Sequence, residues 1–104
     1  MKTFGETIRE AREAKGLLLR EVAASIEVDP SFLSRIESSA KRATREQVMA
    51  LAKVLDEDAE KLLVLYLGER VVYQLRDEEL AIEAISVAEK IIRYKARKPK
   101  NRKN

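Results

Sequence analysis

Two apolar segments separated by only three residues constrain the fold of this chain most. The first segment is apolar at the spacing of one helix face, at Leu19, Val22, Ala23 and Ile26. A second helix is expected to begin at Pro30, because a proline at the first helical position loses no hydrogen bond, and Asp29 is a suitable N-cap. Residues 27–29 are then the whole connection. Two helices joined by so short a turn cross at a steep angle.

Three more helices in the first two thirds of the chain follow from capping pairs and apolar spacing. Thr3 with Glu6, and Thr44 with Gln47, have the spacing of a capping box. The helix after Thr3 is expected to end near Lys15, with glycine following. The helix after Thr44 carries an apolar stripe at Val48, Leu51, Ala52 and Leu55. Asp58 is positioned to cap a further helix over residues 62–67.

The C-terminal third contains one ambiguous segment and one strongly patterned helix. Residues 68–75, GERVVYQL, suit a strand or a helix, and we favour a helix. From Asp77 onward one apolar stripe falls at Leu80, Ala84, Val87, Ile91 and Tyr94. A second stripe beside it falls at Ala81, Ile85, Ala88 and Ile92. Two stripes are wider than one packing partner covers, so we expect one to dock on the protein's own domain and the other on a second copy. The alternative is a monomeric core completed by this helix.

Composition excludes several classes of function. The chain has no Cys, no His and no Trp. The chain therefore lacks thiol nucleophiles, the usual zinc ligands and the usual general base near neutral pH. We expect no enzymatic activity, no bound metal and no cofactor. The N-terminal segment MKTFGETIRE is not a secretory signal, and the apolar run LLVLYL is too short to span a bilayer. We expect a cytoplasmic protein that does not enter membranes.

The net charge of +3 comes from the end of the chain. Residues 97–104, RKPKNRKN, contain five basic and no acidic side chains. Pro99 prevents the preceding helix from continuing. We expect a basic disordered tail here, which either adds salt-sensitive attraction to phosphates or only increases solubility.

From about Phe4 to Leu63 the sequence resembles the helix-turn-helix regulators of the Cro and phage-repressor type, also called the xenobiotic-response-element family. The matching motifs are Arg-x-x-Lys-Gly-Leu at 12–17, Arg-Glu-Val-Ala at 20–23 and Leu-Ser-Arg-Ile-Glu at 33–37. The resemblance implies an all-α fold: a five-helix lambda-repressor-like DNA-binding domain over residues 1–67, with a C-terminal helical dimerisation extension over 68–96. Its third helix would enter the major groove of double-stranded DNA.

The resemblance also assigns roles to particular residues. Ser31, Ser34 and Arg35 fall at base-reading positions, and Arg35 is suited to bind guanine through two parallel hydrogen bonds. Arg12 and Glu37 fall at positions that form a structural ion pair. Phosphate contacts are expected from the residues that follow the third helix, namely Ser38, Lys41, Arg42 and Arg45. For the base-reading and the phosphate-contacting residues, the alternative is a solvated surface without a ligand.

Four residues depart from the family pattern. Leu18 replaces the hydroxyl residue that caps the second helix, and Leu19 replaces a glutamine that binds a phosphate in many members. Glu27 and Ser39 replace glycines, where a left-handed backbone costs another residue on the order of 1 kcal/mol.

Two classes of binding function fit the sequence. The first is a regulator that binds a roughly palindromic operator as a homodimer, and both restriction-modification controllers and phage-type repressors belong to it. The second is an antitoxin that regulates its own operon and masks a toxin with its C-terminal helix.

Overall fold

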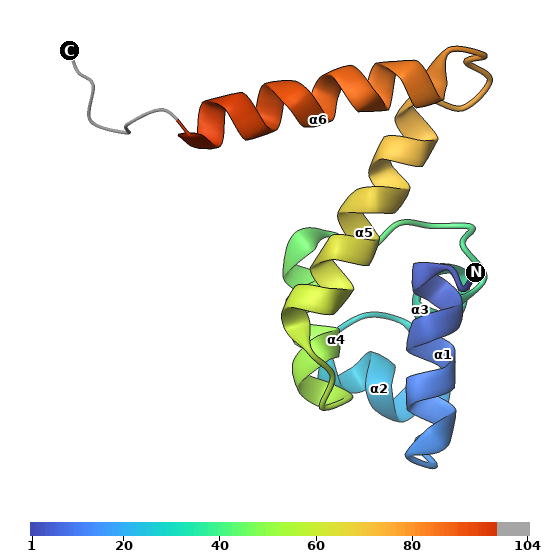
Figure 1. Ribbon diagram of the computed structural model, residues 1–104. Coiled ribbons are helices and arrows are strands. Elements are labelled where there is room, and N and C mark those ends of the chain that lie inside the picture. Colours follow the sequence, from blue (N-terminus) through green and yellow to red (C-terminus); the bar gives the residue numbers. More distant parts are fainter. Residues whose placement is uncertain (98–104) are drawn as a thin grey trace. The chain divides into compact units, whose positions relative to one another are not determined.

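The computed structural model describes residues 1–97, which form six α-helices and no strand (Figure 1). The helices are α1 (Phe4–Ala14), α2 (Leu19–Ser25), α3 (Pro30–Glu37), α4 (Arg45–Val54), α5 (Ala59–Gln74) and α6 (Ala81–Arg97). The expected all-α fold is confirmed. The chain divides into two compact units, one over residues 1–71 and one beginning at Val72. Of the expected tail, Arg97 ends α6, and the rest, with Pro99, lies outside the described residues.

The capping pairs that the sequence indicates are formed. The Glu6 N–H donates to Thr3 Oγ1 and the Thr3 N–H to Glu6 Oε1, both at 3.0 Å, which starts α1. Thr44 and Gln47 make the same reciprocal pair at the start of α4, at 2.9 and 3.1 Å. Asp58 Oδ1 accepts from the Glu60 N–H at 2.9 Å and so caps α5. Side-chain acceptors thus satisfy backbone donors that these helix starts would leave open.

Two expected helix starts differ in detail. Leu18 has no side-chain acceptor, but Glu21 Oε1 accepts the Leu18 N–H at 2.8 Å, so one half of a capping box remains at α2. Asp29 occupies the N-cap position of α3, yet its side chain bonds no helix N–H. Its carbonyl oxygen instead accepts from Phe32 and Leu33, at 3.0 and 3.1 Å. The expected N-cap position of Asp29 is therefore confirmed, but its side chain makes no capping hydrogen bond, and Pro30 has no N–H to satisfy.

The ends of α1 to α4 share one backbone motif. Each is followed by a residue with positive φ, and these are Gly16 (68°), Glu27 (61°), Ser39 (68°) and Asp56 (55°). The N–H three residues beyond the helix end then bonds back into its last turn, as from Val28 to the Ala23 carbonyl at 3.0 Å. This is the Schellman arrangement, which glycine adopts most readily. The left-handed conformation expected where Glu27 and Ser39 replace glycine is confirmed.

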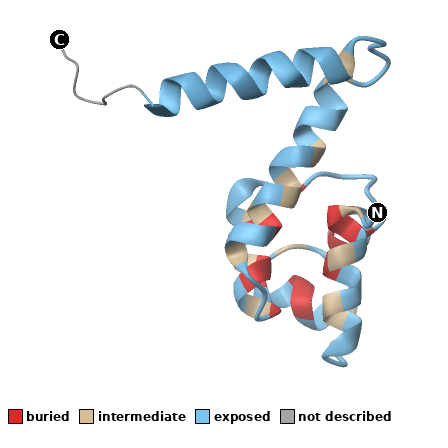
Figure 2. Ribbon diagram, viewed as in Figure 1, coloured by how far each residue is buried: buried red, intermediate tan, exposed pale blue. Residues whose placement is uncertain are grey.

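The core of the first unit lies between α1 to α4 and the first turns of α5 (Figure 2). Its largest fully buried side chains are Ile8, Val22, Leu33, Ile36, Val48, Leu51 and Leu55. The ambiguous segment is resolved as helix, since α5 runs through Gly68 to Gln74. The N-terminal half of α5 joins the first unit through Leu62, which is 3% exposed.

The second unit contains the end of α5, a turn and α6. The helix expected from Asp77 begins later, at Ala81. Asp77 has a φ of 68°, which is not helical, and it lies within the turn between α5 and α6. Leu80 therefore precedes α6. None of the α6 side chains is buried, so both apolar stripes are exposed. Among the described helices, none is long and apolar enough to cross a membrane.

Candidate nucleic-acid interface

The two sides of α3 differ sharply in burial. Leu33 is 0% and Ile36 2% exposed, and both belong to the core. Ser31, Ser34 and Arg35, at i, i+3 and i+4, are exposed. The three residues expected to read bases therefore share one accessible face of a helix that is fixed from its other side.

The turn before α3 sets the position of this face. α2 and α3 pack on each other, with Ala23 fully buried where the chain turns back. The left-handed Glu27 reverses the chain, and the two bonds to the Asp29 carbonyl start the new helix. Pro30 and Ser31 are exposed at the N-terminal end of α3, the end that approaches base edges in helix-turn-helix proteins.

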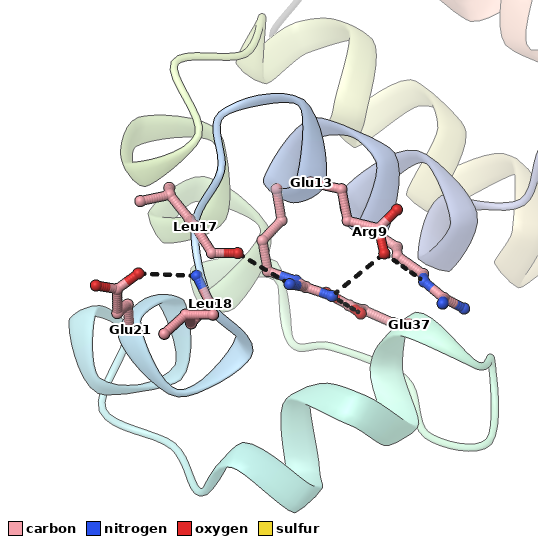
Figure 3. A network of polar contacts seen from close by, with 7 residues as sticks. Arg9, Glu13, Leu17, Leu18, Glu21 and Glu37 are labelled. Atoms are coloured by element: carbon pink, nitrogen blue, oxygen red, sulfur yellow. Dashed lines mark hydrogen bonds and ion pairs between the residues drawn. The ribbon is translucent and has the colours of Figure 1, made fainter.

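The C-terminal end of α3 is fixed by an ion pair to α1. Arg12 Nε donates to Glu37 Oε2 at 2.8 Å, and Arg12 Nη2 donates to Glu37 Oε1 at 3.1 Å (Figure 3). Arg12 Nη1 also donates to the Leu17 carbonyl at 3.0 Å, so one guanidinium joins α1, α3 and the start of the connection to α2. The pair is largely buried, with side-chain exposures of 12% and 7%. The two residues that the resemblance pairs are thus in bidentate contact.

The electrostatic setting of Arg12 keeps it charged. The hydrogen bonds that Arg12 donates to Glu37 raise the pKa of Arg12 above its ordinary value and outweigh burial, which lowers the pKa. Glu13, which pairs with Arg9 at 3.1 Å on the exposed side, lies 4.0 Å from Arg12 and adds further negative charge (Figure 3). No buried polar side-chain atom in the described part of the chain lacks a partner.

The segment after α3 carries cations and no acid. Residues 38–45 read SSAKRATR, with Lys41, Arg42 and Arg45 exposed. Ala43, 4% exposed, anchors the segment in the core, and Thr44 fixes its end through the α4 capping box. The basic side chains therefore extend from a backbone that is held at both ends.

Ser38 is exposed, and its Oγ donates to the Arg35 carbonyl at 3.2 Å. A hydroxyl can rotate to another acceptor, so a phosphate oxygen would have to take the place of this carbonyl. The phosphate role of Ser38 stays a prediction.

Two residues that position α1 were missed by sequence reasoning. Gly5 lies where α1 touches the end of α3, and an added Cβ would overlap the carbonyl oxygens of Ile36 and Glu37. Glu69 of α5 accepts the Phe4 N–H at 2.6 Å and so binds the start of α1. The only sequence signal for the contact between α1 and α3 was a glycine, Gly5, in the first turn of a helix. Nothing local signals the second, because 65 residues separate its partners.

The residues expected to mediate dimerisation lie in the second unit. Val87, Ile91 and Tyr94 are 55%, 50% and 59% exposed, and Ala84 is also exposed. Leu80, just before α6, is 67% exposed. No group of side chains that could hold a metal occurs in residues 1–97.

Comparison with known proteins agrees with this geometry. A family model described as a helix-turn-helix domain matches residues 3–65. A comparison with curated protein sequences finds no match. Among solved structures, a crystal structure of the clp gene regulator ClgR from Corynebacterium glutamicum is 29% identical, with a TM-score of 0.54, and the match covers 64% of this chain and 86% of that chain.

A second crystal structure of ClgR is 24% identical with a TM-score of 0.56, covering 80% of this chain and 88% of that one, and shows a likeness of fold. The family match spans more than half of the chain and includes α1 to α4 with the turn between α2 and α3. The chain therefore belongs to the helix-turn-helix domain family of DNA-binding proteins.

Proposed function

We propose that this protein is a transcriptional regulator that binds a roughly palindromic DNA operator as a homodimer and reads each half-site with α3. The observation that carries the proposal is the division of α3 into a fixed side and an accessible side. A recognition helix needs both, because base contacts discriminate only when the helix is held in register.

Arg35 is the main base-reading residue in this proposal. It is exposed, and no ion pair holds its guanidinium among the described residues. A guanidinium matches guanine O6 and N7 through two hydrogen bonds, worth about 1–3 kcal/mol of discrimination. Ser31 and Ser34 contribute less, since a hydroxyl bonds several bases or a phosphate.

Lys41, Arg42 and Arg45 contact phosphates in this proposal. Arg45 is the first residue of α4, where the positive end of the helix dipole disfavours a cation. A DNA phosphate at that end would bind both the dipole and the guanidinium. Such contacts fix the register of α3 without reading sequence.

The role in gene regulation is supported by the structural comparison. The solved relative at 29% identity is a clp gene regulator. In this proposal the protein acts by occupying its operator near a promoter.

Arg35→Ala and Arg35→Lys test the DNA-binding mode. The probes are a duplex selected by the wild-type protein from a random library and an unselected duplex of equal length. Arg35→Ala should weaken binding to the selected duplex by about 5- to 150-fold. Arg35→Lys keeps the charge but loses the paired hydrogen bonds, so it should lose selectivity while retaining affinity for unselected DNA. Equal losses on both duplexes would show that Arg35 does not read bases.

The mass in solution tests the homodimer. The chain is 11.9 kDa, and the wild-type protein should have twice this mass. Val87→Glu, in the exposed apolar stripe, should give monomers, whereas Ser86→Glu on the polar side should not. A wild-type protein that stays monomeric at high protein concentration and on DNA would contradict the homodimer. It would favour a different protein, such as a toxin, as the occupant of the α6 surface.

A further inference from the structure

We infer that α6 pairs with α6 of a second copy in the antiparallel direction, with Glu83 of each copy facing Arg97 of the other. This inference rests on the proposed homodimer and adds the orientation of its helices. It also identifies the charges that select this orientation.

The apolar surface of α6 is suited to another helix. A row of small side chains, Ala81, Ala84 and Ala88, lies between two rows of large ones. Val87 and Ile91 on one side are 55% and 50% exposed, and Ile85 and Ile92 on the other are 40% and 67% exposed. A second helix can pack on the stripe of Ala84, Val87, Ile91 and Tyr94, where the small Ala84 allows close approach.

Charge is unevenly distributed along α6. Glu83 lies in the first turn of α6, Glu89 and Lys90 lie at its middle, and the basic residues Arg93, Lys95 and Arg97 lie in its C-terminal part. Glu89 and Arg93 bind each other within the helix, at 2.9 Å. Glu83, Lys95 and Arg97 have no ion pair in the described part of the chain. The helix therefore presents an acidic end and a basic end.

This distribution complements itself only when the two helices are antiparallel. Glu83, Lys90 and Arg97 recur every seven residues and so lie along one edge of the stripe formed by Val87, Ile91 and Tyr94. With full antiparallel overlap, Glu83 of each copy faces Arg97 of the other copy, which makes two opposite-charge pairs. Of these three residues, only Lys90 meets its own counterpart, at the two-fold axis. In a parallel pair, Lys90 lies beside Lys95 of the second copy, and Glu83 and Arg97 never meet.

The helix dipoles act in the same direction. Antiparallel helices place the negative end of one dipole beside the positive end of the other, whereas parallel helices place like ends together. Within one copy, Glu83 and Arg97 are 14 residues apart on a straight helix, or about 21 Å, so they cannot pair there. Their only opportunity to pair is between copies.

Cysteine cross-linking tests the orientation directly, because the chain has no cysteine of its own. Glu83→Cys and Arg97→Cys proteins should each fail to form a disulfide-linked dimer on mild oxidation, since equivalent positions lie about 21 Å apart in the antiparallel pair. A mixture of the two proteins should form the linked dimer. Lys90→Cys should link to itself, and Ser86→Cys, on the polar side, should not.

Charge exchange gives an independent readout. Glu83→Arg and Arg97→Glu should each weaken dimerisation by about 3- to 30-fold, and the double variant Glu83→Arg/Arg97→Glu should restore it. Self-linking of Glu83→Cys within a stable dimer, or no rescue in the double variant, would overturn the antiparallel pairing while leaving the homodimer intact. A wild-type monomer with no cross-link in any variant would instead overturn the proposed homodimer. Far-UV circular dichroism of each variant confirms that α6 remains helical.

Discussion

Arg12 in α1 and Glu37 at the end of α3 bind each other through two hydrogen bonds, of 2.8 and 3.1 Å, while Arg12 also binds the Leu17 carbonyl at 3.0 Å. The guanidinium thus fixes the end of α3 opposite to the one that is proposed to approach DNA. Because the pair is mostly excluded from water, each charge depends on the other for its solvation.

Removing the charge of Glu37 should therefore destabilise the fold. Glu37→Gln leaves Arg12 with only the longer contact to Glu13, at 4.0 Å, and we expect a loss of about 2–4 kcal/mol in the free energy of unfolding, measured by urea denaturation. Glu13→Gln, which removes the exposed pair with Arg9 and this longer contact but leaves the bidentate pair, is the control and should cost less than about 1 kcal/mol. Equal losses in the two variants would contradict a special role for the Arg12–Glu37 pair.

Alkaline pH should not release this pair. A group whose pKa is raised on folding contributes stability that is fully present below its unfolded pKa and is lost only as the pH rises through the folded pKa. For Arg12 both values lie far above neutrality, since Glu37 raises an already high pKa. The coupling energy between Arg12 and Glu37, measured by a double-mutant cycle, should therefore be the same at pH 7 and pH 10. A decline over this interval would show that Arg12 loses its proton.

Gly5 and Gly68 should respond in opposite ways to alanine. At Gly5 a methyl group would overlap the backbone of Ile36 and Glu37, so Gly5→Ala must push α1 away from α3 and should cost about 1–3 kcal/mol. At Gly68, inside α5, the methyl group would meet no atom, so Gly68→Ala should stabilise by up to about 1 kcal/mol. Thermal unfolding of both variants provides the comparison. A neutral Gly5→Ala would mean that α1 and α3 do not approach so closely.

The turn between α2 and α3 should tolerate, and benefit from, glycine. Glu27 has a φ of 61°, a conformation that is strained for any residue with a Cβ. Glu27→Gly should raise the free energy of unfolding by about 0.5–1 kcal/mol, after the greater freedom of glycine in the unfolded chain is subtracted. The reverse change at an equivalent position, Gly16→Ala, should lower it by a similar amount. A destabilised Glu27→Gly would show that the Glu27 side chain makes a contribution larger than its backbone strain.

Local patterns predicted most of the first unit. The capping boxes at Thr3 and Thr44 and the short turn are each encoded within a few residues, so sequence spacing is sufficient to find them. The left-handed Glu27 was expected only from the resemblance, which places a glycine at this position. The pair of Arg12 with Glu37 spans 25 residues, and only the resemblance to a known family indicated it.

Contacts between distant helices could not be predicted in this way. The close approach at Gly5 and the bond from Phe4 to Glu69 depend on how α1, α3 and α5 pack together, which apolar periodicity does not specify. Periodicity also could not fix the conformation of residues 68–75, because Val71 and Val72 suit a strand locally. Helix α5 extends through them from a start that is anchored in the core.

Arg45 should contribute to DNA binding and not to folding. Arg45→Gln removes a cation from the N-terminal end of α4, where it opposes the helix dipole, so the free protein should be as stable as wild type or more stable by up to about 1 kcal/mol. If Arg45 contacts a phosphate as proposed, the same variant should weaken binding to selected and unselected duplexes alike. It should also reduce the slope of log K against log salt concentration by about 0.9. Lys53→Gln, at the C-terminal end of the same helix, is the matched control for charge and should leave that slope unchanged. Equal slopes for Arg45→Gln and wild type, in proteins of equal stability, would remove Arg45 from the phosphate-contacting set and leave Lys41 and Arg42 as the cations that fix the register of α3.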